Sequence, residues 1–164
     1  MDPNNAFTKE ECFNVLDRLG TGVLSVNGAD GWPYAVPINY IRIGDKVYFH
    51  GKKKGTKVSL IEKDSKCTLV VYDEKGYEDC GANACDTTVV YDSVIIRGYA
   101  KAVEDDETKM MMLRALVDKL VPAKKENPVA PARVPPTGVF VIEIEEITGK
   151  HHVPKMGNKV HPTN

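Results

Sequence analysis

The stretch VYFHGKKKGTK, residues 47–57, carries the most information in this chain. Its β-branched and aromatic start predicts a strand at residues 46–50, and the apolar spacing beyond its end predicts a short helix at 56–63. Glycines let the backbone approach a ligand closely, a helix N-terminus supplies unpaired N–H groups, and lysines add full positive charges. The turn between the strand and the helix is therefore predicted to bind an anion such as a phosphate.

This turn is not the phosphate loop of nucleotide hydrolases. That motif has four residues between its glycines and ends in Gly-Lys-Ser/Thr, whereas three residues separate Gly51 from Gly55 and Thr56 precedes Lys57. A solvated, lysine-rich turn remains the alternative to phosphate binding. His50, at the mouth of the turn, is either a ligand or an ordinary hydrogen-bonded polar residue.

The residues before this stretch predict one helix and two strands. Thr8 and Glu11 have the spacing of a capping box, which marks the start of a helix. Short apolar segments at 22–26 and 34–41 have the composition of strands. Because Pro37 has no N–H group to donate, the second strand is expected to lie at a sheet edge or to contain a bulge.

The residues after the stretch complete a mainly β chain. The expected elements are a strand at 67–72, a loop at 74–86, a strand at 93–103, a helix at 104–120, an extended connection at 121–136 and a strand at 139–147. Short turns between consecutive strands favour antiparallel pairing, and six short strands with one apolar face each are best closed into a small barrel. The fold class predicted is thus a six-stranded antiparallel β-barrel with helices. It forms one domain over residues 1–150, followed by a polar tail at 151–164 that contains histidines and lysines and is either disordered or folded over another part.

The bulk properties restrict the partners and the compartment. The chain has 164 residues and a net charge of −1, which gives no electrostatic reason to expect binding to nucleic acid or to an anionic membrane. No apolar run reaches the roughly 20 residues of a membrane helix, and the N-terminus lacks a signal-peptide core, so a cytoplasmic location is expected. The four cysteines are scattered and are expected to be free thiols, with no metal site. A metal or redox role for Cys80 and Cys85 is the alternative.

Three segments together carry a family resemblance. They are NGADGWPYAVPINY at 27–40 followed by VYFHGKKKGTK, then SVIIRGYA at 93–100, and finally ITGK at 147–150. In this order and spacing they resemble nitroimidazole-resistance (Nim-type) proteins, which belong to the pyridoxamine 5'-phosphate oxidase-like FMN-binding split barrels. The likeness extends from residue 20 to residue 150.

The resemblance implies a six-stranded split barrel that works as a homodimer, with an FMN molecule in each of two grooves at the subunit interface. It places one strand alongside the isoalloxazine ring: Val36, Pro37, Ile38, Asn39 and Tyr40. It assigns the phosphate and ribityl chain to His50, Gly51, Gly55 and Lys57, with Lys52 as a weaker addition. Ser93 and Arg97 reach the flavin in this picture, from the same chain or from the partner.

The implied activity is that of an FMN-dependent oxidoreductase. Electrons from NAD(P)H or another donor would pass through the flavin to a small acceptor such as a nitroimidazole. Because the flavin carries the chemistry, no catalytic residue is assigned, although His50 is the candidate. The alternatives are a flavin- or haem-binding sensor, with His50 or a tail histidine (His151, His152 or His161) on the iron, a deazaflavin protein, or a pyridoxamine-phosphate oxidase, whose arginine- and serine-rich signatures are not evident.

Overall fold

The computed structural model describes residues 5–163. These residues form three α-helices, two short 3-10 helices and seven strands. In chain order they are α1 (Lys9–Arg18), β1 (Thr21–Asn27), β2 (Pro33–Ile43), β3 (Lys46–Gly51), α2 (Thr56–Lys63), β4 (Lys66–Asp79), β5 (Thr87–Ala102), α3 (Asp106–Leu120), η2 (Pro122–Lys124), η3 (Pro131–Arg133), β6 (Gly138–His152) and β7 (Val160–His161).

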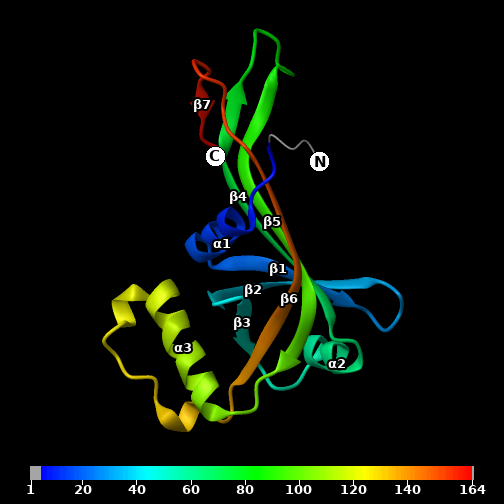
Figure 1. Cartoon of the computed structure of the whole chain (residues 1–164), viewed down its shortest axis with the longest axis vertical. Helices are drawn as coiled ribbons and strands as arrows, with labels where there is room; N and C mark the ends of the chain where they lie inside the picture. Colours follow the sequence, from blue (N-terminus) through cyan, green and yellow to red (C-terminus); the bar gives the residue numbers. More distant parts are fainter. Residues whose placement is uncertain (1–4, 164) are drawn as a thin grey trace.

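Six of the strands close into a ring, in the lower half of Figure 1. Their order is β1-β2-β3-β6-β5-β4, all neighbours are antiparallel, and β4 pairs again with β1. The predicted six-stranded antiparallel split barrel is confirmed. The predicted capping box is also present, because the Thr8 side chain accepts from the Glu11 N–H group and the Glu11 carboxylate accepts from the Thr8 N–H group.

The ring is split between β2 and β3. Their ladder begins with the pair of Ile43 and Lys46, on either side of the turn that joins the two strands. It ends with the pair of Tyr40 and Phe49. Residues 33–39 of β2 pair only with β1, so their other edge is not covered by β3. Pro37 lies on this edge in continuous register with Val23, which agrees with the predicted edge position and shows no bulge there.

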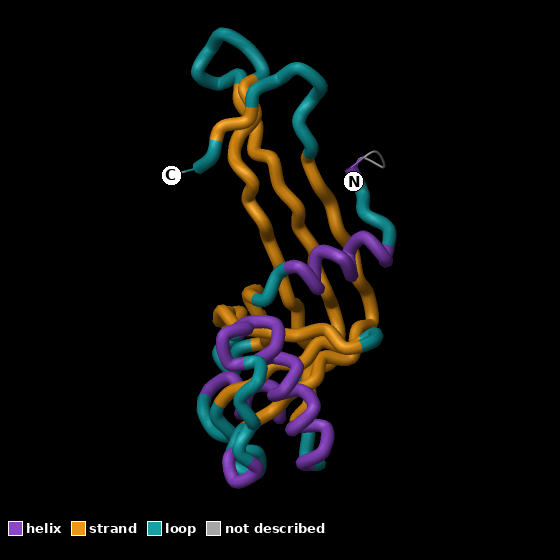
Figure 2. Tube along the Cα trace, turned by 90° about the vertical axis from the view of Figure 1, so that its left-hand side faces the viewer, coloured by secondary structure: helices purple, strands orange, loops and turns teal. Residues whose placement is uncertain are grey.

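A long arm projects from the barrel, as Figures 1 and 2 show. It consists of the outer parts of β4 and β5, the end of β6, and the C-terminal residues with β7. The predicted loop at 74–86 is therefore wrong for residues 74–79, because β4 runs to Asp79, and residues 80–86 connect the two strands. Pairing with β5 satisfies the backbone of these polar residues, which local composition does not reveal.

Two apolar clusters hold the barrel together. One fills the barrel interior and includes Tyr40, Phe49 and Leu69, all wholly buried. The other lies between α3 and the outer face of the sheet, where Met112 and Leu116 pack on strand residues such as Tyr48. After α3, the connection at 121–136 is not simply extended, because η2 and η3 fold it into two turns. Among residues 5–163, no helix is long and apolar enough to cross a membrane.

Candidate functional site

The split in the ring brings the two main predicted segments together. The β2–β3 ladder stops at Tyr40 and Phe49, so Asn39 and His50 are the first residues beyond it on their two strands. From there the chain continues past His50 into the loop that begins α2. We call residues 50–57 the cradle. The cradle and the free edge of β2 therefore both begin where the ladder ends.

The first turn of α2 presents backbone donors to the cradle. Gly55 is the N-cap, and no side chain caps the helix. The first N–H groups of a helix have no acceptor within it, so those of Thr56, Lys57 and Val58 are free to bind a ligand. Gly55 has a φ of 127°, which favours glycine, and a Cβ there would meet nothing within 4 Å. No acidic residue lies in this first turn. Such a helix start is suited to an anion, and it carries no acidic counter-charge of its own.

Lys57 brings a full charge to the same place. Its Nζ lies 5.0 Å from the centre of the Phe49 ring, and a Cβ on Gly51 would lie 3.5 Å from it. The side chain is thus folded back over the end of β3. Burial lowers the pKa of Lys57, and no ion pair involves this lysine within the described part of the chain.

His50 borders the cradle as a neutral group. Burial and, to a smaller extent, the positive charge of Lys57 lower the pKa of His50. Its imidazole is therefore more often neutral than that of a free histidine at the same pH, and the neutral ring has one nitrogen able to donate and one able to accept. Lys52, in contrast, is exposed in the loop.

Several side chains of β2 are packed inside the barrel and are not available to a ligand. Ile38 is buried, Val36 packs against the interior cluster, and Tyr40 is wholly buried with its hydroxyl donating to the Leu16 carbonyl at 3.1 Å. Burial raises the pKa of Tyr40 well above its usual range. Asn39 donates to the Thr21 hydroxyl at 3.0 Å. What this strand offers a ligand is mainly its free backbone edge.

Ser93 and Arg97 lie elsewhere on the barrel. Both are on β5, which is separated from β2 by β1 and β4. On β6, which lies between β3 and β5, the cradle end of β3 pairs with Val139, whereas Arg97 pairs with Glu146, so about 20 Å of strand separates the two places. Arg97 pairs with Glu146 at 3.1 Å and borders a shallow groove of about 500 Å³ on the outer face of the sheet. Within one chain, these two residues and the cradle are not brought together.

A pocket next to the cradle was not predicted. It has a volume of about 590 Å³ and is lined by residues of the sheet, of α3 and of the segment that follows α3. Its lining residues are Asn39, His50, Leu113, Leu116, Val117, Leu120, Val121, Val129, Arg133 and Thr137. The sequence contained one indication of this pocket. The apolar face of α3 is broader than packing against the sheet alone requires, so part of it was available to line a pocket.

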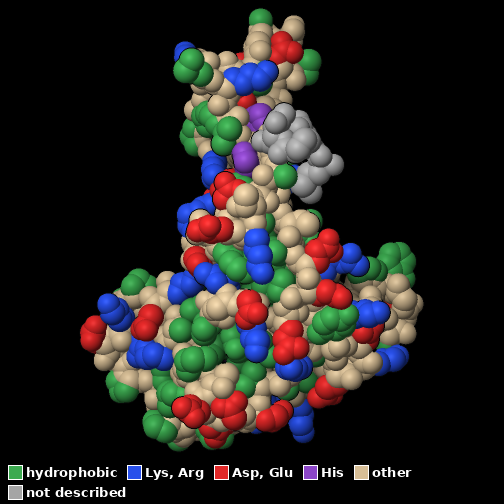
Figure 3. Space-filling view, in the orientation of Figure 1, with side chains coloured by type: hydrophobic (Ala, Val, Ile, Leu, Met, Phe, Trp, Pro, Cys, Tyr) green, Lys and Arg blue, Asp and Glu red, His purple; other side chains and the backbone are tan. Residues whose placement is uncertain are grey.

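The tail histidines lie on the arm, where Figure 3 shows histidine side chains in purple. His151 packs against Phe7, His161 stacks on Tyr77, and His152 bonds to Glu78. Cys80 and Cys85 are exposed free thiols in the arm's connecting loop. Among residues 5–163, no group of three or more histidine, cysteine or acidic side chains is arranged to hold a metal ion.

Comparisons with known proteins agree with this architecture. Residues 8–151 match the model of a protein family described as pyridoxamine 5'-phosphate oxidase. No curated protein sequence matches the chain significantly.

Several solved structures share the fold. The flavocytochrome Anf3 from Azotobacter vinelandii is 26% identical, with a TM-score of 0.77 over 90% of this chain and 69% of that one. A candidate 5-nitroimidazole antibiotic resistance protein from Bacteroides thetaiotaomicron is 19% identical, with a TM-score of 0.74 over 88% of this chain and 86% of that one. A FAD and heme binding protein from Mycobacterium smegmatis is 18% identical, with a TM-score of 0.78 over 98% of this chain and 76% of that one.

Proposed function

Because the chain belongs to the pyridoxamine 5'-phosphate oxidase family, which residues 8–151 match, we propose that it binds FMN in the cradle and acts as a flavin-dependent oxidoreductase. The observation that carries this proposal is Lys57, a half-buried lysine without an ion pair within residues 5–163, beside a helix N-terminus without a side-chain cap. Burying part of a charge costs free energy unless a partner compensates. A phosphate of charge about −2 is such a partner.

The cradle fits the phosphate end of FMN, and the edge of β2 fits the ring end. Lys57 and the first N–H groups of α2 would hold the phosphate, with Lys52 and the open space at Gly55 beside them. The isoalloxazine ring has donors and acceptors along its edge that need partners when buried. The unpaired backbone edge of residues 36–39 offers such partners.

When bound, the flavin supplies hydride or electron transfer between NAD(P)H, or another donor, and a small acceptor such as a nitroimidazole. This chain's own contribution is to bind and orient the cofactor. His50 contributes a neutral imidazole at the mouth of the cradle, where it can hold or release a proton near the bound ring.

The proposed working form is a homodimer. Ser93 and Arg97 lie level with the far end of β6 from the cradle, about 20 Å along that strand, so we expect them to reach the flavin of the cradle from a second copy. The outer sheet face that carries Arg97 also exposes apolar side chains, namely Val23, Tyr72, Ile95 and Tyr99. Such a face is suited to pairing with another chain.

Lys57→Ala tests the phosphate assignment directly. A charge-assisted contact contributes about 1.5–3 kcal/mol, so the variant should bind FMN roughly tenfold to a hundredfold more weakly in a fluorescence titration of the apoprotein. Lys63→Ala removes the same charge from the other end of α2 and should leave the affinity unchanged. Equal affinities of the two variants would contradict the assignment, and a wild-type protein that takes up no FMN would contradict the proposed function.

Haem binding is the second candidate, and the pocket beside His50 favours it. A neutral imidazole on the wall of a mostly apolar cavity is the environment of an axial haem ligand. The visible spectrum of the purified protein separates the two candidates. A single intense band near ~400 nm indicates haem, and two broader bands indicate oxidised flavin.

A cytoplasmic location accompanies this proposal. All four cysteines are free, and the two exposed thiols would persist in a reducing compartment.

A further inference from the structure

The pocket beside α3, which we call the α3 pocket, is open to solvent and of a size suited to a small organic ligand. Its volume of about 590 Å³ lies within the usual range of roughly 300–1,000 Å³ for such sites. Most of its wall is aliphatic, from α3 and from the segment that follows it: Leu113, Leu116, Val117, Leu120, Val121 and Val129.

The only charge on the wall of the α3 pocket is positive. Arg133 is the only charged lining residue, and no ion pair involves it within residues 5–163. Asn39, His50 and Thr137 supply the other polar groups, and His50 is neutral because burial and Lys57 lower its pKa. No carboxylate lines the pocket. A ligand with an apolar body and one negative group complements this wall.

The segment that carries Arg133 is held in place. Arg114 of α3 donates to the Asn127 carbonyl at 2.5 Å, which ties the segment to the helix. Around Arg133 itself, the Thr137 hydroxyl donates to the Arg133 carbonyl at 2.7 Å, and the adjacent Val134 is 2% exposed. The backbone of Arg133 is thus held by a folded turn at one side of the pocket, and its side chain is exposed.

The α3 pocket shares two wall residues with the proposed flavin site. Asn39 and His50 line the pocket, and they are also the first residues beyond the β2–β3 ladder, where the cradle begins. A ligand in the pocket would therefore lie beside the proposed flavin site, where the ring strand and the cradle meet.

We propose that the α3 pocket binds the electron acceptor of the enzyme, and that this acceptor is an apolar molecule carrying one carboxylate, which Arg133 recognises. The acceptor role rests on the proposed flavin function. The preference for a carboxylate rests on the pocket wall alone.

The test compares two probes that differ by one carboxylate. 4-Nitrobenzoate and nitrobenzene are titrated calorimetrically into the FMN-loaded protein without any electron donor, so that no turnover occurs. We expect the wild type to prefer 4-nitrobenzoate by about tenfold, since Arg–carboxylate pairs are charge-assisted but this arginine is exposed.

Arg133→Met should remove this preference without changing the affinity for nitrobenzene. Lys125→Met removes a charge from the same segment at a residue that does not line the pocket, and it should keep the preference. Leu113→Trp fills the pocket and should weaken the binding of both probes. Equal binding of the two probes by the wild type, or a preference that survives Arg133→Met, would overturn the inference.

A parallel FMN titration separates the two proposals. Arg133→Met should bind FMN as the wild type does, and 4-nitrobenzoate should bind without displacing FMN. Competition between 4-nitrobenzoate and FMN would show that the pocket belongs to the cofactor, which overturns the acceptor role and leaves the flavin proposal intact. Failure of the wild type to bind FMN overturns the proposed function and the acceptor role together.

Discussion

The arm and the cradle each contain a charged side chain that is at least partly buried, but only the one on the arm has partners that compensate its charge. On the arm, the carboxylate of Glu78 has no exposed surface and accepts hydrogen bonds from His152 Nε2 at 2.7 Å and from the Lys155 N–H group at 2.8 Å. Asn158 Nδ2 also donates to it. In the cradle, the half-buried Lys57 has no ion-pair partner within residues 5–163. A satisfied buried charge stabilises the fold, whereas an unsatisfied one indicates a binding site for the missing partner.

The largest of the predicted effects is the loss of tail docking when the buried carboxylate of Glu78 is removed. Glu78→Ala leaves three donors of the tail without their acceptor, so the docking of the tail should weaken by about 3 kcal/mol, since one hydrogen bond to a charged group contributes about 1.5–3 kcal/mol. The Asp79 N–H group, which donates to the Lys159 carbonyl, reports this docking. Its hydrogen exchange should become about a hundredfold faster.

Glu74→Ala is the matched control, because Glu74 is an exposed glutamate on the same strand. It should leave the exchange of the Asp79 amide unchanged. Equal exchange rates in the Glu78→Ala protein and the wild type would show that the buried carboxylate does not hold the tail.

Acid should release the tail without any substitution. The hydrogen bonds from His152 and from the Lys155 backbone lower the pKa of Glu78 below its usual 4.5. A carboxylate with a lowered folded-state pKa contributes stability that is fully present above its unfolded pKa and is lost as the pH falls through the folded pKa. The Lys155 amide shift in NMR spectra should therefore stay constant down to about pH 5 and change only below the unfolded pKa of Glu78. A transition of this amide near neutral pH would contradict the assignment.

The charge of Lys57 should lower the stability of the FMN-free protein, whereas the charge of Glu78 should raise stability. Burial lowers the pKa of Lys57, so its charged form costs stability at every pH below that lowered value. Lys57→Met should therefore raise the thermal midpoint of the FMN-free protein while weakening FMN binding. At alkaline pH the stability difference between the two proteins should shrink as the wild-type lysine loses its proton. A variant that is less stable than the wild type at pH 7 would show that the lysine serves the fold.

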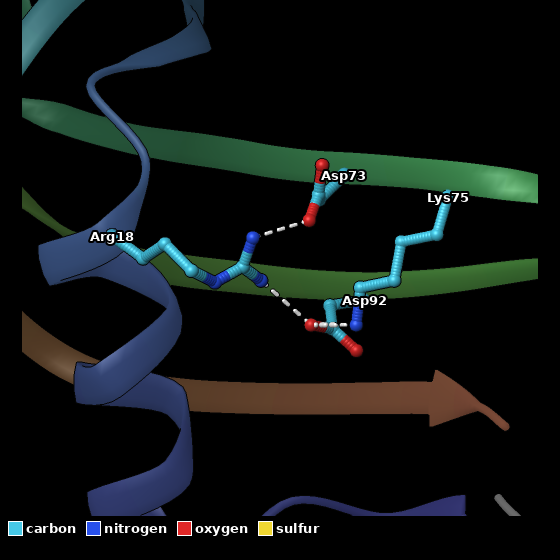
Figure 4. A network of polar contacts seen from close by, with 4 residues as sticks. All are labelled: Arg18, Asp73, Lys75 and Asp92. Atoms are coloured by element: carbon cyan, nitrogen blue, oxygen red, sulfur yellow. Dashed lines mark hydrogen bonds and ion pairs between the residues drawn. The ribbon is translucent and has the colours of Figure 1, made fainter.

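The smallest effect is expected at the base of the arm, where Figure 4 shows a network between α1 and the hairpin. Arg18 contacts Asp73 and lies 2.7 Å from Asp92, which Lys75 also contacts at 2.6 Å. Arg18 is half exposed and Lys75 still pairs with Asp92 without it, so Arg18→Ala should cost about 1 kcal/mol or less in chemical denaturation. A loss similar to that of Glu78→Ala would show that this network, and not the tail, fixes the arm.

The same two regions differ in how well the sequence predicts them. The cradle is local: Gly51, Gly55 and Lys57 lie within seven consecutive residues, and a strand before them and a helix after them suffice to place the turn. The barrel was predictable for a related reason, because alternating apolar residues mark each strand.

The arm depends on contacts between distant residues. Glu78 lies more than 70 positions before His152, and its strand continues only because β5 and β7 pair with it. Residues 74–86 contain glycines and many polar side chains, which locally resemble a loop. The α3 pocket was missed for a similar reason, since it forms only where the segment after α3 folds back toward Asn39 and His50.

The docking of β7 also has a consequence for the outer edge of the arm. Its two residues cover Tyr77 and Glu78 on β4, and a Cβ on Gly76 would lie 2.2 Å from the His161 carbonyl oxygen, so the tail passes very close to this glycine. Uncovered strand edges recruit other chains into mixed sheets and insoluble aggregates. A protein truncated after His152 would expose this edge together with the Glu78 carboxylate. Residues 153–163 are therefore expected to keep this edge from pairing with other chains, and they should be kept whenever the protein is shortened for study.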